Sequence, residues 1–232
     1  WSSDVCSSDL EDASVGIDFD SVVHDKTALG KAVGRILRTF HQPALVERFI
    51  EGREIYVPLL GNHPRRSLPL TEIHFGAAFE KRPKVISYAA KWEPESAECI
   101  DSPSGPCSLE PELEERCVAT AMAAFEALEC RDYGRVDLRL APDGQCYVID
   151  INPNCDLHPH SGFAKAASSA GINYPDLALH LVELALEREN GNQAHRKEGP
   201  AAARRPIGSH LIVLATRTLM RARANRSRAG GN

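Results

Sequence analysis

Apolar and polar residues alternate on both sides of Pro142-Asp143-Gly144, in the stretch 133–154. Alternation with a period of two, interrupted by such a tripeptide, predicts two antiparallel strands joined by a tight turn. The first strand carries an apolar face with Val136, Leu138 and Leu140, and a polar face with Arg135, Asp137 and Arg139. On the second strand we expect Tyr147, Ile149 and Ile151 on the apolar face and Cys146, Val148, Asp150 and Asn152 on the opposite face.

Both apolar faces have to lie on one side of the sheet, which requires an even number of residues in the loop. A two-residue turn at Asp143-Gly144 places Asp137 directly opposite Asp150, whereas a four-residue loop places the two one diagonal step apart. Because Pro142 lacks the N–H that closes the narrow turn, both alternatives stay open. In either case two carboxylates, an amide and an arginine converge on one side of the hairpin.

The same periodicities predict the other elements. Helices are expected from the N-cap Asp25 to residue 39 or 40, after Ser108, at 162–170 and from Tyr174 onwards. Strands are expected at 44–50 and 55–60, joined as a hairpin by a turn at 51–54, and at 70–75 and 85–92. The last of these strands ends beside Lys91.

The two ends of the chain differ from the rest. Residues 1–10 show no helical or strand periodicity and resemble translated sequencing-adapter text, so we expect a non-native segment after which the chain starts in mid-protein. Residues 201–232 contain seven Arg and no Asp or Glu. We therefore expect one partial domain at 11–190 and a basic, disordered tail at 191–232, with a basic amphipathic helix as the alternative for the tail.

Composition narrows the class of protein. The 232 residues are 43% hydrophobic and 25% charged, as in ordinary soluble domains. A net charge of -5 gives no reason to expect nucleic acid. Seven cysteines without Cys-x-x-Cys spacing favour reduced thiols over disulfides or zinc. No apolar run approaches the roughly 18 residues of a membrane span, so a cytoplasmic protein is expected.

The hairpin is the main candidate for chemistry. Two carboxylates a strand spacing apart repel each other, and a divalent cation would remove that cost. Asp137, Asp150 and the Asn152 carbonyl are hard oxygen donors of the kind that Mg²⁺ takes. From the pattern alone, a solvated outer face of an edge hairpin is an equally good interpretation.

Five short motifs together resemble the ATP-grasp carboxylate–amine ligases, closest to the D-alanine–D-alanine ligases. They are Glu11-Asp12-Ala13-Ser14-Val15-Gly16, Leu45-Val46-Glu47-Arg48-Phe49-Ile50-Glu51-Gly52-Arg53-Glu54, Tyr88-Ala89-Ala90-Lys91, Gly134-Arg135-Val136-Asp137 and Asp150-Ile151-Asn152-Pro153-Asn154. The resemblance runs from about residue 11 to residue 187. It implies an α+β, ATP-grasp fold of antiparallel sheets with packed helices, incomplete at the N-terminus.

The resemblance also implies a role for each matched residue. Ser14, Val15 and Gly16 would form the lid over the ATP phosphates, and Lys91 would lie near the γ-phosphate. Glu47, Arg48 and Phe49 would line the adenine site, and Glu54 would accept the ribose hydroxyls. Asp137, Asp150 and Asn152 would hold two Mg²⁺ ions, for which Mn²⁺ could substitute. Arg135 would steady the acyl phosphate, so Arg135, Lys91 and Ser14 would be the catalytic residues.

The implied reaction joins a carboxylate to an amine through an acyl phosphate made from ATP. Its partners would be small carboxylate and amine substrates, with a homodimer left open. Three departures from the family pattern stand out: the family's N-terminal domain is absent, the usual Glu is Asp150, and Pro153-Asn154-Cys155-Asp156-Leu157 replaces Thr-Ser-Pro-Gly-Met. The isolated chain could thus be inactive, and D-alanine is not implied as the second substrate. The alternatives are a different amino-acid or peptide product, or an inactive nucleotide-binding or interaction module.

Overall fold

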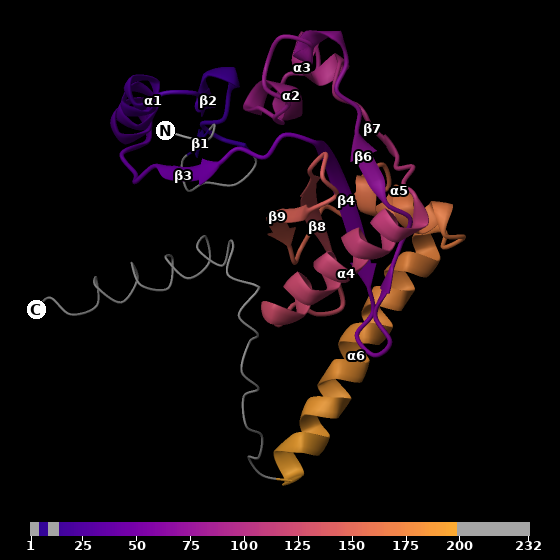
Figure 1. The fold of residues 1–232 in the computed structure, drawn as a ribbon. Coiled ribbons are helices and arrows are strands. Elements are labelled where there is room, and N and C mark those ends of the chain that lie inside the picture. The colour runs from indigo at the N-terminus through magenta and orange to yellow at the C-terminus, as the bar shows by residue number, and fades with distance from the viewer. Residues whose placement is uncertain (1–4, 9–13, 199–232) are drawn as a thin grey trace, which may run out of the picture. The chain divides into compact units, whose positions relative to one another are not determined.

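The computed structural model describes residues 5–8 and 14–198 (Figure 1). Two compact units divide the chain. Unit 1 comprises residues 1–53, 73–105 and 141–143, and unit 2 comprises residues 54–72, 106–140 and 144–232. Residues 199–232, which make up most of the tail predicted to be disordered, lie outside the described part of the chain.

Unit 1 contains a three-stranded sheet with the order β2-β1-β3. The central strand β1 (Val5–Ser8) pairs antiparallel with β2 (Val22–Val23) and with β3 (Leu45–Arg48). The sequence of residues 1–10, which lacks strand periodicity, therefore gives no sign of β1. The predicted hairpin between residues 44–50 and 55–60 is wrong, because β3 pairs with β1 and the second strand belongs to the other sheet.

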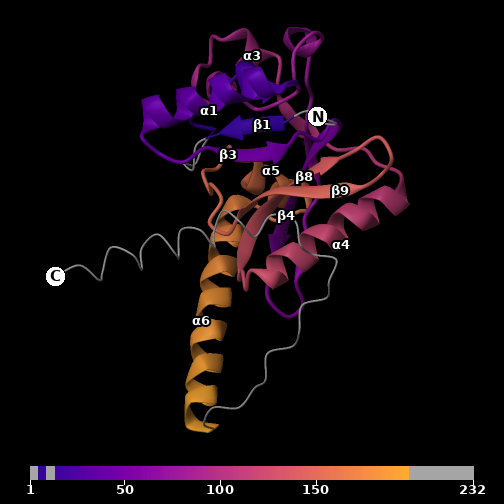
Figure 2. The ribbon, with the colours of Figure 1, turned by 60° about the vertical axis from the view of Figure 1, so that its left-hand side comes forward.

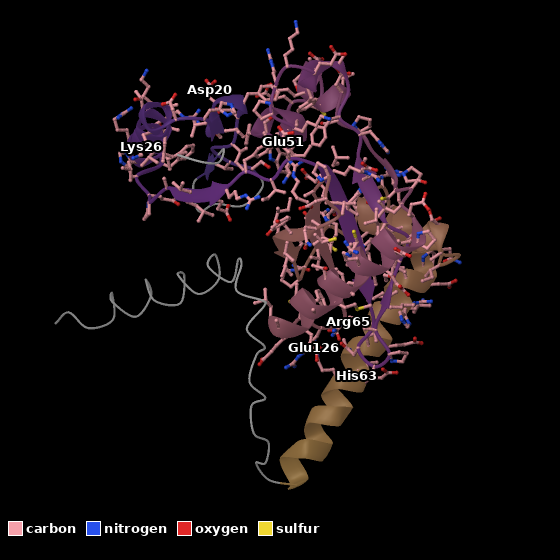
Figure 3. The ribbon with its side chains drawn as sticks, in the orientation of Figure 1. Asp20, Lys26, Glu51, His63, Arg65 and Glu126 are labelled. Carbon is pink, nitrogen blue, oxygen red and sulfur yellow. The ribbon has the colours of Figure 1, made fainter. Side chains whose placement is uncertain are left out.

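The first helix of unit 1 follows its sequence pattern closely. Helix α1 (Lys26–Phe40) begins where the Asp25 carboxylate accepts a hydrogen bond of 2.8 Å from the Ala28 N–H. It ends at His41, which adopts the left-handed conformation with φ of 52°. Figure 3 labels Lys26 at the start of this helix. Both predicted ends of the helix are confirmed.

Unit 1 also contains four short helical segments among its described residues. They are η1 (Phe19–Ser21), η2 (Ala77–Phe79), α2 (Tyr88–Trp92) and α3 (Ala97–Ile100). The buried ring of Phe79 packs edge-on against Phe19 and Phe75. The predicted strand at 85–92 is wrong, since Ser87 caps α2 by accepting a hydrogen bond from the Ala90 N–H.

The second sheet has six strands, in the order β7-β6-β4-β8-β9 with β5 paired to β4, and most of its residues belong to unit 2. The strands are β4 (Arg53–Leu60), β5 (Arg66–Ser67), β6 (Thr71–Ile73), β7 (Ser104–Pro106), β8 (Tyr133–Leu140) and β9 (Cys146–Asn152). Helix α4 (Pro111–Ala127) lies along one face of this sheet (Figure 1). Its N-cap is Glu110 with Pro111 at the first helical position, rather than the predicted Ser108.

The face beneath α4 forms the larger apolar core. Residues at alternate positions of β4 and β8 meet Cys117, Ala121 and Phe125 of α4; these strand residues are Ile55, Val57, Leu59, Val136, Leu138 and Leu140. A side chain at position 134 would clash here, because a Cβ on Gly134 would lie 2.5 Å from Phe125 Cε2. Arg65, labelled near the end of α4 in Figure 3, places its guanidinium 4.8 Å from the centroid of the Phe125 ring.

Two helices pack on the opposite face of the sheet, at its Leu60 end. They are α5 (Gly162–Ser169) and α6 (Tyr174–Glu198), whose apolar residues surround Leu60 and Leu68. Helix α6 extends away from the sheet, as two views show (Figures 1 and 2). Because α6 continues to Glu198, residues 191–198 are helical and the domain boundary predicted at 190 falls within a helix.

The β8–β9 hairpin contains a bulge that the sequence did not reveal. Leu138 pairs with Val148, whereas Asp137 pairs with Asp150, which leaves Ile149 as an extra residue in β9. The loop between the paired residues Leu140 and Cys146 consequently has an odd length rather than the even length expected. The predicted faces of β9 are wrong near the turn, where Cys146 and Val148 pack against the core beneath α4.

Candidate functional site

The face of the sheet opposite α4 carries a group of charged residues from three neighbouring strands. Pairing in β8–β9 brings together Asp137 with Asp150 and Arg135 with Asn152. Strand β4 contributes Glu54, whose side chain alternates with the core residue Ile55. The bulge at Ile149 makes this grouping possible, because it returns Asp150 to the face of Asp137 after Val148 has faced the core.

Asp137 and Arg135 form the most closely bonded pair of this group. The guanidinium of Arg135 donates two hydrogen bonds to the Asp137 carboxylate, from Nε to Oδ1 at 2.6 Å and from Nη2 to Oδ2 at 2.7 Å. The amide of Asn152 donates a further bond of 3.3 Å to Oδ2. Arg135 also lies over the ring of Tyr56, 4.3 Å from its centroid. Two side chains, the charged Arg135 and the neutral Asn152, thus hold the Asp137 carboxylate through three hydrogen bonds.

A second ion pair lies on the same face. Nη2 of Arg139 lies 3.1 Å from Oε2 of Glu54, and both side chains are only 6% exposed. The hydroxyl of Tyr56 donates a hydrogen bond of 2.9 Å to the other oxygen of Glu54. Arg139 and Tyr56 therefore fix the Glu54 carboxylate from two sides.

Burial governs the protonation of this face. It raises the pKa of Asp137 to about 6, and the neighbouring charges of Asp150 and Glu54 also raise it, against the opposing effect of Arg135. For Arg135, burial alone would lower the pKa, but Asp137 raises it above the ordinary value. Burial and the charge of Glu54 raise the pKa of Tyr56. Like charges therefore crowd around Asp137 with a single strong counter-charge.

The donor set suits a hard divalent cation. Two carboxylates face each other across the hairpin, and the Asn152 side chain lies beside Asp137. Because Asp150 raises the pKa of Asp137, a cation between them would relieve a repulsion that is present in the folded chain. Among the described residues, no group of three or more His, Cys, Asp or Glu side chains is placed to bind a metal ion. A metal site on this face would therefore need the amide oxygen of Asn152 as a ligand beside the two carboxylates.

The remaining predicted site residues belong to unit 1. Ser14 and Gly16 adopt positive φ angles of 61° and 75° on either side of Val15, and the Ile17 N–H donates to the Ser14 carbonyl. Glu47 and Arg48 end β3 and precede Phe49. Lys91 lies on α2, so its predicted position at the end of a strand is wrong.

Sequence reasoning missed one residue of the polar face, Tyr56, and the partner of another, Arg139. Tyr56 lies in the predicted strand at 55–60, and because it alternates with Ile55 and Val57 it shares the face of Glu54. Alternation places Arg139 on the polar face, but it does not identify Glu54 on the neighbouring strand β4 as its partner. The alternation of β4 contained the signal for Tyr56.

Comparison with known proteins places this geometry in context. A family model described as "D-ala D-ala ligase C-terminus" matches residues 7–183. The chain is 37% identical over 183 residues to the uncharacterized protein y4sG of Sinorhizobium fredii, covering 78% of this chain and 52% of that protein. It is 32% identical to the D-alanine–D-alanine ligase of Desulforamulus reducens, covering 79% of this chain and 54% of that enzyme.

Solved structures show the same fold. The chain superposes on the D-alanine–D-alanine ligase from Bacillus anthracis complexed with ATP with a TM-score of 0.60 and 23% sequence identity, over 85% of this chain and 55% of that one. This likeness confirms the predicted fold class, an antiparallel sheet with packed helices. The chain covers only part of the complete fold. The chain spans about half the length of the relatives that it matches. In the described residues, no helix has both the length and the apolarity that a membrane crossing needs.

Proposed function

Because the chain belongs to the family of the D-ala D-ala ligase C-terminal domain, we propose that it is the nucleotide- and metal-binding part of an ATP-dependent ligase that joins a carboxylate to an amine. The observation that carries the proposal is the pairing of Asp137 with Asp150 on a buried polar face, beside Asn152. A solvated outer hairpin would leave Asp137 exposed, whereas it is 6% exposed.

The proposed reaction proceeds in two steps. The substrate carboxylate takes the γ-phosphoryl group of ATP, which gives an acyl phosphate and ADP. The amine then attacks the acyl carbon and displaces phosphate. Phosphoryl transfer asks the protein mainly for positioning and for neutralisation of charge. A polar face with alternating carboxylates and guanidinium groups provides both.

Asp137, Asp150 and Asn152 would hold the metal, two Mg²⁺ ions in the proposed complex, with Mn²⁺ as a substitute. Bound Mg²⁺ supplies charge neutralisation for the phosphate oxygens. In the folded chain Arg135 holds both oxygens of Asp137. Coordination of Asp137 would therefore loosen this pair and free the planar guanidinium of Arg135 to bind an oxyanion of the substrate.

The other residues of the family motifs would bind the nucleotide. Glu54 would accept the ribose hydroxyls, since Arg139 and Tyr56 hold its carboxylate in one orientation. Glu47, Arg48 and Phe49 would line the adenine site. Ser14, Val15 and Gly16 would cover the phosphates with backbone N–H groups, and Lys91 would reach the γ-phosphate. These unit 1 roles rest on the order of the motifs in the sequence.

The substrates would be small, with an amino acid or a peptide on each side of the new bond. Relatives from Desulforamulus reducens and Carboxydothermus hydrogenoformans are named D-alanine–D-alanine ligases. The loop that leaves Asn152 differs here, and its His158 N–H donates to Asp156 while Tyr133 donates to Asn154. The loop therefore does not imply D-alanine as the amine substrate.

Thermal melting of a length-completed protein tests the proposal. We expect Mg²⁺ with ATP to raise the melting temperature, since a ligand that binds the folded state stabilises it. Asp150→Ala should abolish this rise, whereas Asp143→Ala, in the turn of the same hairpin, should keep it. Absence of any Mg²⁺-dependent shift in the intact protein would refute the nucleotide site. Release of ADP and phosphate over pairs of amino acids would then identify the substrates.

A further inference from the structure

Two cysteines meet on the core side of unit 2, away from the polar face. Cys117 lies on α4 and is fully buried, while Cys146 opens β9 and is partly exposed. Their sulfur atoms lie 3.5 Å apart and share a hydrogen bond. A disulfide needs a separation of about 2.05 Å, so the two sulfurs have to approach by about 1.5 Å. The pair is thus close enough to be linked by side-chain movement.

The surroundings of Cys146 favour its thiolate. Arg116, one residue before Cys117, donates a hydrogen bond of 2.7 Å from Nη1 to the Gly144 carbonyl, which fixes its charge next to the start of β9. The pKa of Cys146 is lowered to about 7 by the hydrogen bond with Cys117, by the charge of Arg116 and by a hydrogen bond with Thr120, against the effect of burial. Of the three groups that lower the pKa of Cys146, Arg116 is the one that carries a positive charge.

These features separate Cys146 from Cys130 and Cys155. Burial raises the pKa of Cys130, which is also partly exposed, and raises that of Cys155 to about 12. A reactive cysteine combines exposure with a stabilised thiolate, and a resolving cysteine lies within reach of it. Cys146 and Cys117 meet these two descriptions, with Cys117 shielded from solvent.

We propose that Cys146 and Cys117 form a thiol oxidation site, in which a small hydroperoxide converts the pair to a disulfide between β9 and α4. The Cys146 thiolate attacks one oxygen of the peroxide and the O–O bond breaks, so that the other oxygen leaves as hydroxide or alkoxide and takes from solvent the proton that the thiol lost on ionisation, giving water or an alcohol. Sulfur becomes a sulfenic acid and the peroxide is reduced by two electrons. Cys117 then displaces hydroxide from that sulfur, the S–S bond forms, and the thiol proton leaves with the hydroxide as water.

The size of the expected effect follows from the thiolate fraction. At pH 7, a thiol with a pKa of about 7 is roughly half ionised, against about 3% for an ordinary cysteine, a gain of roughly 15-fold. The lower basicity of the thiolate reduces its intrinsic reactivity by about 5-fold. Cys146 should therefore react about 3-fold faster than an ordinary thiol, and by a larger factor than Cys130.

Hydrogen peroxide added to the reduced full chain at pH 7 tests the proposal. Non-reducing peptide mapping should find a Cys117–Cys146 linkage, and Cys146→Ser should leave Cys117 reduced. In Cys117→Ala, oxidation should stop at a sulfenic acid on Cys146 that dimedone traps. Cys130→Ser is the matched control and should form the same linkage as the parent chain.

Two results would overturn the proposal. The first is consumption of peroxide by the folded chain without a Cys117–Cys146 linkage. The second is alkylation of Cys146 by iodoacetamide at pH 7 no faster than that of Cys130 in the same sample. The alkylation measurement uses the unsubstituted chain, so it decides the question even where a Cys117 variant fails to fold.

Discussion

The buried ion pair of Arg139 and Glu54 allows the cost of one substitution to be estimated. The closest atoms, Nη2 and Oε2, lie 3.1 Å apart, and each side chain is 6% exposed. At this distance and an effective dielectric constant of about 20, two unit charges attract each other by about 5 kcal/mol. Desolvation of the two charges costs several kcal/mol for each, so the pair as a whole contributes little to stability.

Arg139→Met removes one charge and leaves the other buried. The hydroxyl of Tyr56 still donates to Glu54, so we expect a loss near the lower end of the range for a broken buried pair, about 3 kcal/mol in the free energy of unfolding. The double variant Glu54→Met/Arg139→Met removes both charges. The free energy of unfolding of this double variant should lie within about 2 kcal/mol of that of the parent chain, because the remaining cost is the hydroxyl of Tyr56, which loses its acceptor.

Hydrogen exchange of the β8 amides in increasing urea is the appropriate assay, because these amides report on unit 2 alone. Glu183→Gln is the control within unit 2: the Glu183 carboxylate lies 3.7 Å from His180 and is 70% exposed, so its loss should cost less than about 1 kcal/mol. The reasoning is refuted if Arg139→Met costs less than about 1 kcal/mol, or if the double variant is less stable than Arg139→Met.

Two other predictions concern packing and pH. Gly134→Ala should destabilise the chain by about 1–3 kcal/mol in urea titrations, because the new Cβ would lie 2.5 Å from Phe125 Cε2; Gly30→Ala, in the open interior of α1, should stabilise it by about 0.5–1 kcal/mol. Equal effects of the two would contradict the packing. With chelator present, the free energy of unfolding should fall as pH rises from about 4 to 6, since folded Asp137 has a pKa of about 6 and binds more protons than the unfolded chain. Asp137→Asn should flatten that slope, and an unchanged slope would exclude Asp137 as its source.

Local patterns were sufficient where an element depends on its own residues. The apolar spacing of α1 and the capping carboxylate of Asp25 act within one helix, so both of its ends could be predicted. The polar face of β8 followed from simple alternation, and Arg135 and Asp137 share it as expected. The family motifs then connected this hairpin to Glu54, a contact between strands that alternation alone does not supply.

Pairing between distant segments was not predictable in this way. β3 and β4 follow each other in the sequence, which suggested a hairpin, but β3 pairs with β1 from a segment without any periodicity. In β9, Val148 and Ile149 are both β-branched and apolar, so nothing in the local sequence indicates which of them is the extra residue of the bulge. The choice depends on the partner strand and on the core beneath α4.

The bulge in β9 also affects how the chain behaves in concentrated solution. In the described part of the sheet, β9 is the terminal strand, and a regular terminal strand invites pairing with the same strand of another molecule. The extra residue at Ile149 twists and interrupts this edge, and the carboxylate of Asp150 follows it directly. The feature that aligns the carboxylates thus also opposes edge-to-edge aggregation.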